Sequence, residues 1–155
     1  MFRRRVEPPA PSRLARAEPD LAARIAAAPA TAQRAIAAGV ASLAVRETGL
    51  ADPVVERALR SIRGGAPVAA DVRAAVTSLL FGLEQRQWHL QDLVEEGREA
   101  PANQAAAFAQ ARACNAVEYA LAEDPLTAVL EATYETLVAV GDMIGVRSVL
   151  AENGC

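Results

Sequence analysis

Hydrophobic positions recur every three or four residues along most of the chain, a pattern that predicts helices rather than strands. The longest stripe consists of Val72, Val76, Leu79, Leu83, Leu90 and Leu93. Because the spacing alternates mainly between four and three residues, these side chains share one face of a single helix, at about residues 67–96. A helix of about thirty residues extends about 45 Å, so we expect it to be a central helix that spans the domain.

Shorter stripes predict the other helices, and turn residues separate them. Asp-Pro pairs at 52–53 and 124–125 are typical helix starts, because Asp accepts hydrogen bonds from the first turn and Pro fits the first helical position. No segment alternates with a period of two. We therefore predict an all-α protein, a single-domain helical bundle of about six or seven helices over residues 18–155. Residues 1–17, with five arginines and three prolines, are predicted to be a flexible basic tail.

The composition favours closely packed helices in a bacterial protein. Of the 155 residues, 52% are apolar but only 4% are aromatic, and alanine is abundant. All sixteen basic residues are arginine, which together with the alanine content indicates a GC-rich genome. The basic N-terminus is not followed by an apolar run, and the longest uncharged apolar stretch, residues 35–45, is too short to cross a membrane. With only two cysteines, we expect a cytoplasmic protein without a disulfide framework.

The charge changes sign along the chain. Residues 1–81 contain twelve arginines and seven acidic residues, whereas residues 82–155 contain four arginines and twelve acidic residues. The net charge of the second part is therefore −8, although that of the whole chain is only −3. An acidic surface of this kind favours a basic protein partner, because complementary potentials raise the association rate and specificity. The opposite charges would also allow the acidic half of one copy to bind the basic half of another copy, which would form a homo-oligomer.

The residues that catalysis or metal binding requires do not form a recognised pattern. His89 is the only histidine, and Cys114 and Cys155 do not have zinc-ligand spacing. There is no phosphate-binding glycine loop. Cys114 lies within an apolar helix, where a small buried side chain is the simplest role. We therefore predict that the protein is not an enzyme and has no cofactor.

Trp88, the only tryptophan, marks the most distinctive part of the chain. On a helix it shares a face with Phe81, Glu84, Asp92 and Glu95, and this face is distinct from the Val72–Leu93 stripe. Trp88 is therefore either the centre of a second layer of the core or part of an exposed recognition surface, since tryptophan is favoured at interfaces. We name a candidate interaction surface that consists of Glu84, Trp88, His89, Asp92, Glu95, Glu131, Tyr134 and Glu135.

One part of the chain resembles a known class of proteins. Residues 84–135 resemble small alanine-rich helical proteins of actinobacteria in their general composition, not in a diagnostic motif. The resemblance is carried by the segments QDLVEEGR at 91–98, ARAC at 111–114 and DPLTAVLE at 124–131. Some of those proteins resemble immunity proteins of polymorphic toxin systems. The resemblance implies a protein that binds its target stoichiometrically, and it transfers no residue roles.

These observations favour a non-enzymatic protein-interaction module, an immunity-type inhibitor or an adaptor, that binds a basic protein through its acidic C-terminal half. Two other interpretations stay open. The first is a ligand-binding or enzymatic bundle with a pocket near Trp88 and His89. The second is weak nucleic-acid binding through the arginine-rich tail.

Overall fold

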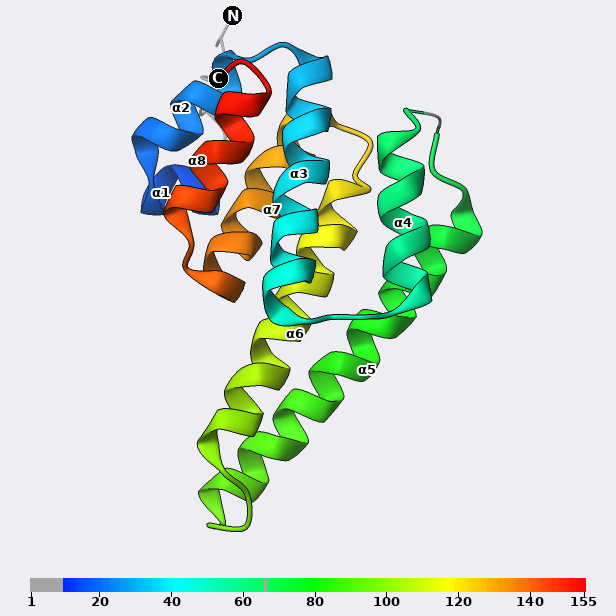
Figure 1. The fold of residues 1–155 in the computed structure, drawn as a ribbon, viewed down its shortest axis with the longest axis vertical. Helices are drawn as coiled ribbons and strands as arrows, with labels where there is room; N and C mark the ends of the chain where they lie inside the picture. Colours follow the sequence, from blue (N-terminus) through cyan, green and yellow to red (C-terminus); the bar gives the residue numbers. More distant parts are fainter. Residues whose placement is uncertain (1–9, 66) are drawn as a thin grey trace, which may run out of the picture.

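Eight α-helices make up the part of the chain that the computed structural model describes, residues 10–65 and 67–155 (Figure 1). They are α1 (Arg13–Ala17), α2 (Pro19–Ala27), α3 (Ala30–Thr48), α4 (Pro53–Arg63), α5 (Ala70–Glu95), α6 (Pro101–Ala120), α7 (Pro125–Val140) and α8 (Met143–Glu152). The prediction of an all-α bundle is confirmed. The additional helix is α1, which lies within the region predicted to be a tail.

Residues 12–17, just before α2, are held in place by local and long-range contacts. Ser12 caps α1 by accepting a hydrogen bond from the backbone N–H of Ala15, and Leu14 is completely buried. The prediction of a flexible tail is therefore wrong for residues 13–17, because a buried leucine and ion pairs of Arg13 hold α1 against α7. Residues 1–9 of the predicted tail lie outside the described residues.

Helix α3 forms the centre of the body, where it packs on α6 and α7 and also contacts α4 and α8. Small residues allow this close packing. Ala37, Ala41 and Ala44 are completely buried on α3. A Cβ atom on Gly39 would lie 2.6 Å from Cγ1 of Val149, so glycine is required where α3 meets α8.

Helix α5 is the long helix that the sequence predicts, but it is not central. Its first half packs on α4 and α6, and its second half leaves the body and forms a hairpin with the start of α6 (Figure 1). We call residues 81–108 of this hairpin the arm, and the other described residues the body. The striped residues Leu83, Leu90 and Leu93 are only half-buried, and none of residues 88–106, all of them described, is fully buried. The stripe thus indicates one apolar helix face, but not how many helices cover it.

Asp52, Asp124 and Asp142 cap α4, α7 and α8 by accepting hydrogen bonds from first-turn backbone N–H groups at 2.8 Å. The two predicted Asp-Pro helix starts are thus confirmed. Across the described residues, none of the helices has the length and apolar character that a membrane crossing requires.

Candidate functional site

The eight residues of the predicted surface lie in two separate places. The first group is on α5 in the arm, and consists of Glu84, Trp88, His89, Asp92 and Glu95. The second group is on α7 and consists of Glu131, Tyr134 and Glu135. Arg112 of α6 connects the two groups, since its guanidinium contacts both Glu84 and Glu135.

The second group belongs to an arginine–glutamate network formed by Arg13, Glu84, Arg112, Glu131 and Glu135. The side chain of Glu135 is completely buried at its centre. Its Oε1 lies 2.7 Å from Nη1 of Arg13, and the two groups form an ion pair that lacks the alignment of a hydrogen bond. Its Oε2 accepts a hydrogen bond from Nη1 of Arg112 at 3.3 Å. Arg13 also donates from Nε to Glu131 at 2.8 Å, and Arg112 donates from Nη2 to Glu84 at 3.0 Å.

Aromatic rings cover the two arginines of the network. The Arg13 guanidinium lies 4.5 Å from the ring centre of Tyr134 and 5.4 Å from that of Tyr119, and Arg112 lies 5.7 Å from Phe108. These distances are within the range of cation–π attraction. Burial lowers the pKa of Arg13, but its contacts with the carboxylates of Glu131 and Glu135 outweigh burial and raise that pKa above its ordinary value.

The network is a structural tether rather than an open surface. It joins α1, α5, α6 and α7, and it neutralises charges that the sequence assigns to an acidic face. Glu135 therefore lies outside any exposed surface of this structure. Arg13, which the sequence assigns to a basic tail, is bound to two carboxylates.

The first group lies on an exposed face of the arm. Phe81 and Trp88 are seven residues apart on the side of α5 that faces away from the half-buried stripe, and they are 63% and 54% exposed. The structure thus places Trp88 on the surface, which is one of the two positions that the sequence leaves open. Exposed aromatic side chains of this size are typical anchors of protein interfaces.

Phe108 of α6 is a third exposed aromatic side chain of the arm. Helices α5 and α6 run antiparallel (Figure 1), and Arg112, one turn after Phe108 on α6, donates a hydrogen bond to Glu84 of α5 and lies 5.7 Å from the Phe108 ring centre. Phe108 is also exposed. Sequence reasoning missed it because the pairing of the two helices is set by the fold, and no local pattern shows it.

Carboxylates surround these aromatic side chains. Asp92 and Glu95 are exposed on the same side of α5, and His89 is exposed beside Asp92. We call Phe81, Trp88, Asp92 and Glu95 together the aromatic–acidic face.

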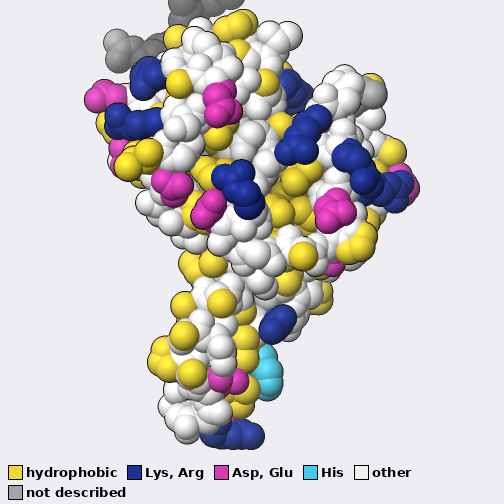
Figure 2. All heavy atoms as spheres, viewed as in Figure 1, with side chains coloured by type: hydrophobic (Ala, Val, Ile, Leu, Met, Phe, Trp, Pro, Cys, Tyr) yellow, Lys and Arg dark blue, Asp and Glu magenta, His cyan; other side chains and the backbone are white. Residues whose placement is uncertain are grey.

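A groove of opposite character lies on the body between α3 and α4. Its volume is about 490 Å³. We call it the α3–α4 groove, and it is lined by Thr31, Arg34, Ala35, Ala38, Gly39, Ile62, Arg63 and Gly65. Small side chains form the α3 wall, and two arginines are the charged groups among the described lining residues. Figure 2 shows hydrophobic side chains between α3 and α4 with basic side chains around them.

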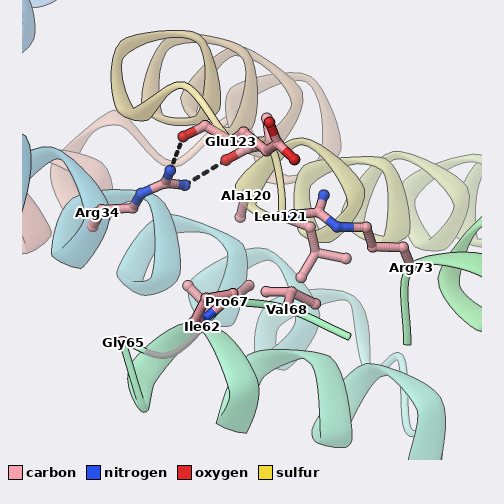
Figure 3. A pocket seen from close by; sticks show the side chains of 10 residues that line it. Arg34, Ile62, Gly65, Pro67, Val68, Arg73, Ala120, Leu121 and Glu123 are labelled. Atoms are coloured by element: carbon pink, nitrogen blue, oxygen red, sulfur yellow. Dashed lines mark hydrogen bonds between the residues drawn. The ribbon is translucent and has the colours of Figure 1, made fainter. Parts of the chain in front are cut away.

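A second hollow of about 430 Å³ adjoins this groove and shares Arg34, Ile62 and Gly65 with it. Arg34 spans the gap to the turn between α6 and α7, where it donates hydrogen bonds to the carbonyl oxygens of Ala122 and Glu123 (Figure 3). Its guanidinium is thereby fixed at the edge of both hollows.

Two candidate chemical features of the sequence, a metal-type cluster and the thiol of Cys114, can be placed in the structure. Within residues 10–65 and 67–155, no three His, Cys, Asp or Glu side chains form a group suited to a metal ion. Cys114 is buried, as the sequence predicts, and burial together with the charges of Glu118, Asp52 and Glu84 raises the pKa of its thiol to about 12. At that pKa the reactive thiolate is scarce at neutral pH.

In comparisons with known proteins, no family model, curated protein or solved structure matches this chain significantly.

Proposed function

We propose that the protein is a non-enzymatic interaction module, and that it binds a basic protein partner with the aromatic–acidic face of its arm. The observation that carries the proposal is the exposure of Phe81 and Trp88 on one face of a projecting hairpin. Exposed aromatic side chains supply the apolar contact area of an interface, and the surrounding carboxylates select a basic surface. A stoichiometric inhibitor of the immunity type and an adaptor, acting in the cytoplasm, would both function in this way.

The arm is suited to binding because the network holds it in place. Glu84 and Arg112 link the base of the arm to Glu135 inside the body. Little rotational freedom is then lost when a partner binds, which favours affinity. A ligand site beside Trp88 and His89 has less support, since both side chains are exposed and the two hollows lie elsewhere.

The test compares the wild type with a variant of the arm in binding to partners from the native cell extract. The double variant Phe81→Ser/Trp88→Ser removes two exposed rings and should leave the fold intact. Ile144→Ser is the matched control, because Ile144 is also strongly exposed but lies at the start of α8. A captured basic protein is purified, and its affinity for each variant is measured by titration calorimetry at low and high salt.

We expect the arm variant to lose affinity by at least about thirtyfold, the effect of removing an interface hot spot. The control should bind like the wild type, and salt should weaken the wild-type complex. If the arm variant kept the wild-type affinity for every captured protein, the arm would not be the binding site and the proposal would be wrong.

A further inference from the structure

The chain carries two surfaces that differ in side-chain size and in the sign of their charge. The aromatic–acidic face presents bulky rings among carboxylates. The α3–α4 groove presents a wall of small residues, with Arg34 and Arg63 as its charged lining groups. Bulky side chains pack well against a wall of small ones, and the charge of each surface would offset that of the other.

The two surfaces also agree in size. Phe81 and Trp88 are separated by about 10 Å along α5, at 1.5 Å per residue. On the α3 wall, Thr31 and Ala38 are also separated by seven positions, which gives the same length of about 10 Å. The volume of the groove, about 490 Å³, is within the range of about 300–1,000 Å³ that is usual for binding sites.

Geometry determines which molecules could bring these surfaces together. The arm points away from the body, so it does not reach the α3–α4 groove of its own chain (Figure 1). Two arms packed face to face would bring the Asp92 and Glu95 carboxylates of both copies together, and like charges at an interface are unfavourable. Placing an arm in the groove of another copy avoids both difficulties.

We infer that the partner of the arm is a second copy of this chain, whose α3–α4 groove receives Phe81 and Trp88. This inference rests on the proposed function, because it uses the same face of the arm and specifies the basic surface that the face binds. The contact is heterologous, since a different surface is used on each copy. It closes as a dimer if two copies exchange arms, and it extends into a chain if they do not.

The test uses one variant for each surface. Phe81→Ser/Trp88→Ser removes the rings of the arm. Thr31→Glu/Ala35→Glu places two carboxylates on the exposed wall of the groove. Ala23→Glu/Ala26→Glu is the matched control, because it adds the same charges to exposed positions of α2 away from the groove. Circular dichroism verifies that each variant is folded, and sedimentation equilibrium from low micromolar to near-millimolar concentration measures association.

We expect the wild type and the control to associate equally, with a dissociation constant that rises as salt is added. Each surface variant alone should associate at least tenfold more weakly. An equimolar mixture of the arm variant and the groove variant should form a one-to-one complex, because one molecule retains an intact groove and the other an intact arm. This recovery on mixing is specific to an arm-in-groove contact.

Three results would overturn the inference. A wild type that stays monomeric at all concentrations would exclude the arm-in-groove contact. In that case the proposed function would still hold if the arm were needed to capture a different basic protein. A groove variant that associates like the wild type would indicate that the arm binds elsewhere, for example to another arm. An arm variant that associates like the wild type would show that self-association does not use the arm.

Discussion

Replacing Glu135 by Gln should destabilise the fold more than any other single charge removal in the arginine–glutamate network. The Glu135 side chain is completely buried and contacts both Arg13 and Arg112. Glutamine keeps the shape of the side chain but removes the negative charge between two guanidinium groups. It also turns one acceptor into an NH₂ donor, which would face N–H donors of the arginines.

The size of the effect depends on which ion pairs the two arginines keep after the substitution. Breaking a buried ion pair costs about 3–5 kcal/mol. Arg13 is 37% exposed and keeps Glu131, and Arg112 is 23% exposed and keeps Glu84. Since neither arginine becomes an isolated buried charge, we expect the lower end of that range, about 3 kcal/mol of unfolding free energy. For a domain of this size, this corresponds to a melting temperature lower by about 6–12 °C.

Urea denaturation followed by the helical circular dichroism signal measures this difference, with an unchanged m-value as the check on two-state unfolding. Glu131→Gln is the matched control, because Glu131 is partly exposed and, among the described residues, forms an ion pair only with Arg13. We expect about 1 kcal/mol for the control, and the effect at Glu135 should persist at high salt because a buried pair is poorly screened. If Glu135→Gln cost no more than Glu131→Gln, the network would not stabilise the fold as argued.

Three further predictions concern glycines and a cysteine. Gly39→Ala should cost about 1–3 kcal/mol of unfolding free energy, because its Cβ would lie 2.6 Å from Cγ1 of Val149. Adding Val149→Ala should recover part of that loss in urea denaturation. If the double variant recovered no stability, the clash with Val149 would not be the cause. Gly82→Ala should stabilise the protein by about 0.5–1 kcal/mol in the same assay, since a Cβ there meets open space within a helix; a loss of stability would contradict this. At pH 8 a thiol reagent should label Cys114 only after denaturation, because burial raises the pKa of its thiol to about 12. The free energy of unfolding should fall above about pH 8.5, the ordinary thiol pKa, and Cys114→Ala should lack this dependence.

The sequence predicts helices well where local chemistry sets their ends. Asp52 and Asp124 cap helices at the predicted places, and Gly49 and Gly141 have the positive φ angles that end α3 and α7. The short helix α1 was missed because five residues cannot show a periodic stripe. It is held by the burial of Leu14 and by Arg13, whose partners are 118 and 122 positions away in the sequence.

The candidate site was predictable only as far as one helix extends. The common face of Phe81, Trp88 and Asp92 follows from helical spacing alone. The burial of Glu135 could not be inferred in this way, because it depends on arginines from two other helices. Composition therefore overstates the acidic surface, since carboxylates that bind arginines inside the fold carry little of their charge to solvent.

Single exposed hydrophobic side chains are common, so Ile144 alone carries no functional argument. The arm differs because Phe81, Trp88 and Phe108 gather there, in a chain with only six aromatic residues. It differs also because residues 88–106 of this two-helix hairpin include no fully buried side chain, so the hairpin gains little stability from its own packing. The network at its base compensates for this, since Arg112 binds the arm through Glu84 and the body through Glu135. The ion pairs thus hold the exposed aromatic side chains on a defined surface, as the proposed interaction requires.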